Sequence, residues 1–149
     1  MIRRRTQSRE CALQMLYQYE INPEPLADLF MRFWPGQEEK FPQDIRDFTE
    51  MLVRGVIEHQ QEIDQIISRY ADNWELHRMA IIDRNIMRFA AYELLYLSDV
   101  PPKVSINEAV NLAKKFSQEE SGKFVNGILD KINHTEAPRN PKKNVPSSR

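Results

Sequence analysis

The densest apolar stretch of the chain runs from Ile86 to Leu97, where ten of twelve residues are apolar or aromatic. A helix that is apolar on nearly every side has to be surrounded by other elements. Arg88 and Glu93 interrupt the run, and twelve residues are too few to span a bilayer, so we expect protein rather than lipid around it. The pattern predicts a central helix over about 83–97.

Shorter apolar patterns on both sides of this stretch recur every three or four residues, which is typical of helices with one buried face. His59 and Gln60 interrupt the third of these patterns and predict a break there. The predicted buried faces are Ala12, Leu13 and Leu16; Leu26, Leu29, Phe30 and Phe33; Ile45, Phe48, Leu52 and Val56, continuing as Ile63, Ile66, Ile67 and Tyr70; Ala109, Val110, Leu112, Ala113 and Phe116; and Phe124, Val125, Ile128, Leu129 and Ile132.

Helix starts are predicted from capping residues. Ser105 and Glu108 have the spacing of a capping box, in which the serine caps the helix and the glutamate reaches back to it. Thr6 or Ser8 can cap the first helix, leaving residues 1–7 as a basic arm in front of it. Residues 74–79 are predicted to lead directly into the central helix.

The composition fits one all-α domain. A chain of 149 residues with four glycines and no run of alternating β-branched residues favours helices throughout. Its single cysteine, Cys11, excludes an internal disulfide, and the scattered cysteine and histidines offer no metal or cofactor site. Residues 134–149 are rich in proline, asparagine, lysine and serine, and predict a disordered basic tail.

Charge is distributed unevenly along the chain. Residues 1–9 carry +4, residues 10–133 carry −8, and residues 134–149 carry +3. Arginines at the start of a helix oppose its macrodipole, so stability alone does not favour them there. Two interpretations stay open: these residues bind phosphate, or they keep the N-terminus soluble. The residues concerned are Arg3, Arg4, Arg5 and Arg9. Between Glu20 and Asp64, eleven acids stand against four bases. This stretch predicts a solvated acidic face, which is unsuited to nucleic acid.

Five motifs together resemble the NusB family. They are RRRTQSRECALQMLY at 3–17, RFAAYEL at 88–94, DVP at 99–101, INEAVNLAK at 106–114 and KFVNGILDK at 123–131. The resemblance covers residues 3–132 in order. It implies about seven helices in two subdomains, and a cytoplasmic transcription antitermination factor. Such a factor binds boxA-type nascent RNA together with NusE, a small-subunit ribosomal protein, in the antitermination complex of RNA polymerase during ribosomal RNA transcription.

The resemblance also implies site residues. Lys123, Phe124 and Asn126 combine a cation, an aromatic ring and an amide, which together can bind single-stranded RNA. The alternative for Phe124 is a place in the core, and the alternative for Asn126 is a local backbone hydrogen bond. Tyr17 and Asp83 match positions where the family meets a partner. An exposed apolar stripe would serve NusE or a second copy of the chain, so a homodimer stays open.

Enzymatic activity is not expected, because the sequence has no glycine-rich phosphate loop and its histidines are far apart. Two alternatives remain. One is a helical scaffold that binds only proteins. The other is an RNA-binding domain related to that of ribosomal RNA cytosine methyltransferases, although such a chain is expected to continue into a catalytic domain.

Overall fold

The structure, a computed structural model, describes residues 2–71 and 76–137. All regular secondary structure within these residues is helical. This confirms the predicted all-α class. The elements in chain order are α1 (Ile2–Ile21), α2 (Leu26–Phe33), α3 (Gln43–Glu58), α4 (Gln60–Tyr70), a short 3-10 helix (Leu76–Arg78), α5 (Ile81–Tyr96), α6 (Pro102–Phe116) and α7 (Glu119–Thr135).

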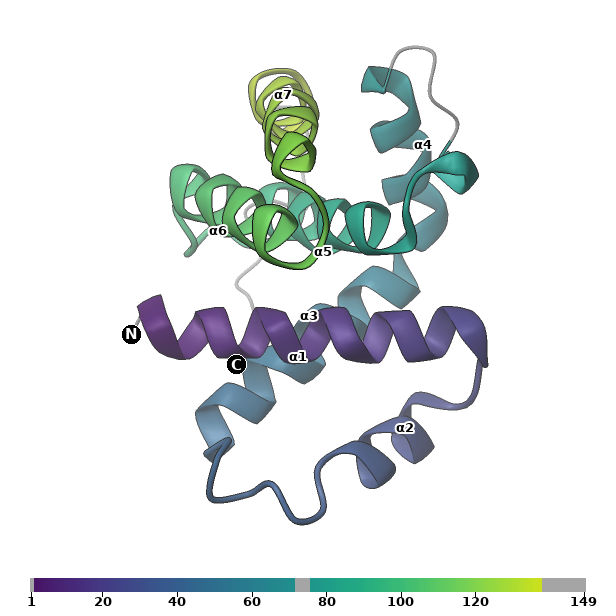
Figure 1. The fold of residues 1–149 in the computed structure, drawn as a ribbon, viewed down its shortest axis with the longest axis vertical. Coiled ribbons are helices and arrows are strands. Elements are labelled where there is room, and N and C mark those ends of the chain that lie inside the picture. The colour runs from purple at the N-terminus through teal and green to yellow at the C-terminus, as the bar shows by residue number, and fades with distance from the viewer. Residues whose placement is uncertain (1, 72–75, 138–149) are drawn as a thin grey trace.

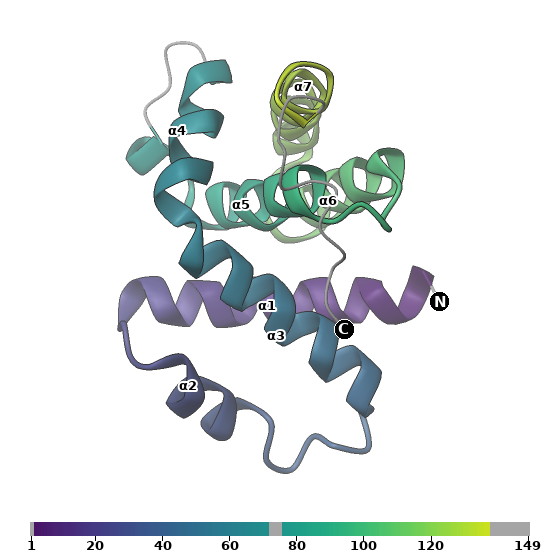
Figure 2. The same cartoon turned by 180° about the vertical axis from the view of Figure 1, so that it is seen from behind.

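The helices form two groups, as Figure 1 shows. In one group α3 packs against α1, and α2 lies below them in this view. In the other group α5, α6 and α7 all pack on one another, while α4 contacts both α5 and α7. The groups meet where α1 and α3 pack on α5, and the view from behind shows α3 crossing α1 obliquely (Figure 2). Within the described part of the chain, seven α-helices thus form the predicted bundle of about seven helices in two subdomains.

Helix α5 is the predicted central helix. Thirteen of its sixteen residues are buried. It begins at Ile81, two residues before the predicted start, and Ala80 before it has an extended backbone with ψ 139°. Leu76–Arg78 therefore forms a separate 3-10 turn. The prediction that this segment leads directly into the central helix is wrong.

The arginine side chains in α5 are buried and paired with half-buried carboxylates of neighbouring helices. Arg88 donates through Nε and Nη2 to both carboxylate oxygens of Asp64 in α4, at 2.8 and 3.0 Å. Arg84 pairs with Glu20 at the end of α1. Burial alone would raise the pKa of Glu20, but hydrogen bonds from Arg84 and Asn85 outweigh it, and the pKa lies below its ordinary value. These pairs join α5 to both subdomains.

Three predicted boundaries are wrong. Helix α1 already includes residues 2–7, so the basic arm is the first part of a helix and not a segment in front of it. Helix α6 begins at Pro102, where proline suits a first helical turn because it has no N–H to pair. Helix α7 continues to Thr135, past residue 134, where the tail was predicted to begin.

The end of α7 changes the predicted extent of the tail. Glu136 accepts hydrogen bonds from Arg69 Nη1 at 2.8 Å and from the Tyr70 hydroxyl at 2.6 Å, and Ala137 is buried. The chain is therefore packed against α4 up to residue 137. The rest of the predicted tail, from 138 to 149, lies outside the described residues.

Candidate nucleic-acid interface

The first turns of α1 present two arginines at the surface. Arg4 Nε donates to Asp44 Oδ2 at the start of α3, at 2.8 Å, and this hydrogen bond holds the pKa of Asp44 below its ordinary value. The Arg5 guanidinium lies 4.2 Å from the centre of the Phe48 ring. A guanidinium has five N–H donors, so both groups can still donate to phosphate. The side chain of Arg3, which precedes them in the helix, lies outside the described residues.

Arg9 has a different position. Only 2% of its side chain is exposed, and it donates through Nε and Nη2 to both oxygens of Glu93, each at 2.8 Å. Ser105 Oγ donates to the same carboxylate at 2.6 Å, and Arg9 Nη1 lies 3.4 Å from Glu108 Oε1. Burial alone would lower the pKa of Arg9, but Glu93 and Glu108 raise it above its ordinary value.

This network explains two differences from the sequence analysis. Ser105 and Glu108 do not form a capping box, because their side chains bond to Glu93, Arg9 and Thr6 in neighbouring helices. Arg9 does not face solvent, because its guanidinium is paired with Glu93 of α5 and Glu108 of α6. These pairs hold α1 against both helices. We therefore leave Arg9 out of the proposed RNA surface.

A second exposed group lies in the first half of α7. Lys123 and Asn126 are exposed, and a Cβ added at Gly127 would meet no atom within 4 Å. These positions are spaced i, i+3 and i+4, so they share one open face of the helix. Phe124 beside them is half-buried and packs against the core. The absence of a side chain at Gly127 thus leaves this face of α7 open to solvent.

The two exposed groups come from helices that lie on opposite sides of α6 (Figure 1). The end of α6 connects them. Lys115 Nζ lies 3.0 Å from Glu10 Oε2 in α1, while Lys114 Nζ lies 3.9 Å from Glu119 Oε2 in α7. A Cβ added at Gly122 would lie 2.8 Å from Lys114 Cε, so the lysine chain lies directly on the backbone of α7. Lys114 and Lys115 therefore lie between the two groups, each near a carboxylate of a neighbouring helix.

The structure separates the two residues assigned to partner contacts. Tyr17 is 45% exposed and lines a shallow hollow of about 330 Å³ at the end of α1 with Ile21 and Arg32. Asp83 is buried and accepts a hydrogen bond from Ser121 Oγ at 3.0 Å. Its other oxygen, Oδ1, has no hydrogen-bond partner within the described part of the chain. Tyr17 is thus accessible to a macromolecule, whereas Asp83 fixes the start of α7.

Ser121 was missed by the sequence analysis. It exchanges a hydrogen bond with Ser117 at 3.1 Å in addition to its bond to Asp83. The signal available in the sequence was its spacing of four residues from Val125, which puts it on the buried face of α7.

The described residues provide no group of three or more metal-ligating side chains. Cys11 is buried, which raises its pKa to about 12, so its thiol is inert as a nucleophile. Within the same residues, no helix has both the length and the apolar character needed to cross a membrane.

The sequence of residues 6–134 matches the family model described as NusB family. The chain belongs to the NusB family. The transcription antitermination protein NusB of Chloroherpeton thalassium is 52% identical over 132 residues, a match that covers 87% of this chain and 61% of that relative. The protein of the same name from Anaeromyxobacter dehalogenans strain 2CP-1 is 48% identical over 132 residues, covering 89% of this chain and 92% of the relative. NusB relatives are thus transcription antitermination proteins.

Solved structures agree with this assignment. NusB from T. maritima has a TM-score of 0.82 and 38% identity, with 91% of this chain and 94% of that one covered. A crystal structure of the antitermination factors NusB and NusE in complex with double-stranded RNA contains a chain with a TM-score of 0.79 and 30% identity, covering 90% and 98%. The NusB resemblance and the predicted fold are therefore confirmed.

Proposed function

We propose that this chain is a transcription antitermination factor that binds boxA-type nascent RNA together with NusE, as part of the antitermination complex of RNA polymerase. The family match over residues 6–134 carries the proposal, and a NusB relative crystallised with NusE and RNA supports it. The chain acts in the cytoplasm during ribosomal RNA transcription and performs no catalytic step.

The proposed RNA surface begins at Arg3, Arg4 and Arg5, continues over the lysines of α6 and ends on the open face of α7. The arginines and lysines bind phosphates, which fixes the position of the strand without reading its sequence. Asn126 reads a base edge through its amide, and the half-buried ring of Phe124 stacks on a base. Sequence discrimination therefore resides mainly in α7.

A basic partner strengthens this binding. Residues 10–133 carry a net charge of −8, which repels the same polyanion that the basic surface attracts. NusE docked at the exposed ring of Tyr17 would lengthen the positive surface. The RNA and NusE would then each increase the affinity of the other, because linkage between two binding sites is reciprocal.

The test is a titration with boxA-like and scrambled single-stranded RNA at several salt concentrations, with and without NusE. If Arg3, Arg4, Arg5, Lys114, Lys115 and Lys123 each contact one phosphate, the slope of log K against log salt is near −4, from roughly −0.7 per contact. Replacing Arg4 and Arg5 by alanine then flattens the slope by about 1.4 for both RNAs. An unchanged slope would rule out the phosphate role of this turn.

Asn126→Ala is the matched variant for sequence recognition, because Asn126 is exposed like Arg4. We expect it to weaken binding of boxA-like RNA more than binding of scrambled RNA, and to leave the salt slope unchanged.

Tight, discriminating binding by the chain alone at physiological salt would contradict the need for NusE. Absence of any RNA crosslink to α1 or α7 would instead favour the scaffold that binds only proteins.

A further inference from the structure

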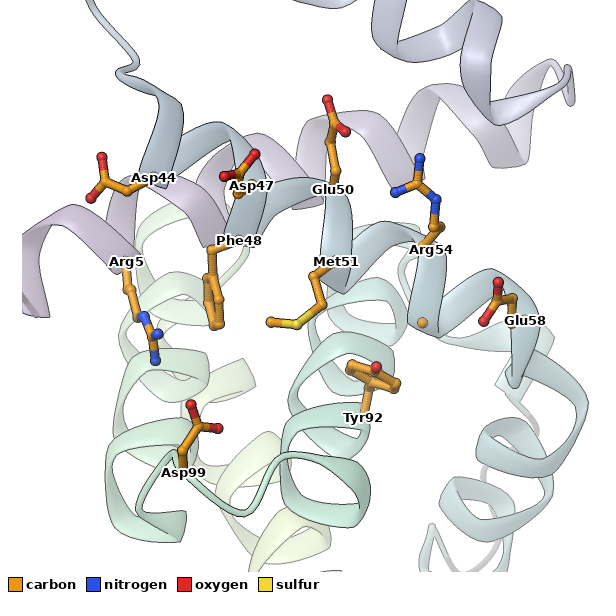
Figure 3. A pocket seen from close by; sticks show the side chains of 11 residues that line it. Arg5, Asp44, Asp47, Phe48, Glu50, Met51, Arg54, Glu58, Tyr92 and Asp99 are labelled. Carbon is orange, nitrogen blue, oxygen red and sulfur yellow. The ribbon is translucent and has the colours of Figure 1, made fainter. Parts of the chain in front are cut away.

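A groove of about 850 Å³ follows the outer face of α3, where α3 meets Tyr92 of α5 and Asp99 in the loop after α5 (Figure 3). We call it the α3 groove. Its floor is apolar and consists of Phe48, Met51 and the ring of Tyr92. A Cβ added at Gly55 would lie 2.1 Å from Tyr92 Cζ, so a glycine is needed for the ring to lie this close to α3.

The rim of the groove is strongly acidic. Figure 3 shows Asp44, Asp47, Glu50 and Glu58 along α3, with Asp99 across from them. The lining also includes two guanidinium groups, which belong to Arg5 and Arg54. The Arg5 and Arg54 groups lie over the rings of Phe48 and Phe30, at 4.2 and 5.1 Å. The lining therefore combines an apolar floor with a formal net charge of −3, with Arg4 outside the lining paired to Asp44. These properties select a basic segment carrying a small apolar group.

We propose that the α3 groove binds residues 138–149 of this same chain. This segment contains four basic residues, no acidic residue, one valine and three prolines. Its charge of +4 complements the −3 of the lining. Prolines disfavour a helix and favour an extended chain, which occupies less width in a groove. Val145 is the apolar group available for the floor.

The length of the segment suits this path. The last described residues are anchored by Glu136 to Arg69 and Tyr70, in the last turn of α4. Helix α4 has eleven residues and spans about 16 Å at 1.5 Å per residue, and it leads back to Glu58 at one end of the groove. Twelve extended residues reach at most about 40 Å, at 3.3–3.6 Å each. Lys142 and Lys143 then fall near Glu58, with Arg149 farther along α3.

Docking of this segment would cover acidic side chains directly beside Arg4 and Arg5. The repulsion between the α3 groove and a polyanion at α1 would fall, since opposite charges within a few ångströms offset each other. Because the segment is part of the same chain, its effective concentration near the groove reaches the millimolar range. The inference stands on the groove and the charges alone, and does not depend on the proposed RNA.

A spin label tests the proposal in the full chain. Ser148→Cys provides the attachment site, because Cys11 is buried and its raised pKa keeps it unreactive. Nuclear magnetic resonance of the labelled chain should show selective broadening of Met51, Gly55 and Asp99. Broadening should decrease as salt is raised, because charge attraction holds the segment.

Two charge-reversed variants of the labelled chain provide the comparison. Asp47→Lys with Glu58→Lys removes complementarity and should abolish the broadening. Glu38→Lys with Glu39→Lys makes the same change of net charge in the exposed loop between α2 and α3, and should leave it intact. Loss of broadening in both variants, or in neither, would overturn the proposal.

Mixing identifies the occupant. Spin-labelled chain without isotope is added to isotope-labelled chain without spin label. Absence of broadening in this mixture supports docking within one chain, whereas equal broadening assigns the groove to a second copy and overturns the proposal. Uniform weak broadening over the whole surface in the first experiment would equally refute it.

Discussion

Replacing Arg9 by methionine tests the claim that this arginine holds the fold together and does not bind RNA. The substitution keeps an unbranched side chain but removes the cation from Glu93, which is fully buried. Removing one partner of a buried ion pair costs about 3–5 kcal/mol, because the remaining charge is left without compensation. Such a loss is a large part of the 5–15 kcal/mol by which domains are usually stable.

Urea denaturation measures this loss. With a slope of about 2 kcal/mol per molar urea, a loss of about 4 kcal/mol lowers the midpoint by about 2 M. Arg4→Met is the matched control, because Arg4 and Asp44 are both exposed, and we expect its midpoint to equal that of the unmodified chain. In the double variant Arg9→Met with Glu93→Leu, most of the stability should return, since an apolar pair can replace a buried ion pair.

Two results would refute this reasoning. A midpoint for Arg9→Met equal to that of Arg4→Met would mean that Arg9 is not buried against Glu93. A salt slope for RNA binding that flattens in Arg9→Met at a temperature where the variant is folded would return Arg9 to the RNA surface.

Three further predictions concern packing and pH. Gly55→Ala should lower the melting temperature, because its Cβ forces the Tyr92 ring away and overpacking costs about 1–3 kcal/mol, more than the helix propensity of alanine returns. Ala91→Asp should unfold the chain or lower its melting midpoint severely in circular dichroism, since Ala91 is fully buried in α5; an unchanged midpoint would contradict the central position of α5. The pKa of Glu20 is lowered in the folded chain, so its ionised carboxylate stabilises the fold at pH values above its ordinary pKa of 4.5. This contribution is lost as the pH falls through the pKa of the folded state. Glu20→Gln should therefore be less stable than the unmodified chain at pH 7, and melts at decreasing pH should show the two converging as the pH falls below the ordinary pKa of 4.5.

The helices were predictable because their signal is local. Apolar spacing within α3, α4 and α7 shows which face is buried without knowledge of what covers it. The break at His59 also followed from the sequence, and α3 does end at Glu58. Helix starts were less predictable, because Ser105 and Glu108 have the spacing of a cap but form hydrogen bonds with other helices.

The candidate site was only partly predictable for the same reason. Exposed Lys123 and Asn126 follow from helical spacing, but the burial of Arg9 depends on a residue 84 positions away. A signal was present: Arg9 falls on the same helical face as Ala12 and Leu13, and Glu93 lies within the most apolar run of the chain. Opposite charges on two apolar faces indicate a buried ion pair. The α3 groove was interpreted only as a solvated acidic face, because its apolar floor includes Tyr92 from a helix distant in sequence.

The network around Arg9 also has a consequence for the order of folding. Its hydrogen bonds join residues separated by 84, 99 and 102 positions, whereas α5, α6 and α7 contact their immediate neighbours along the chain. Closing a long loop is entropically unfavourable until the distant contacts form, so local helix pairs are expected to assemble first. During synthesis on the ribosome, α1 emerges first but cannot complete its ion pairs until Glu108 has been added. The helix that carries Arg4 and Arg5 is therefore locked in place late, when more than two-thirds of the chain has been made.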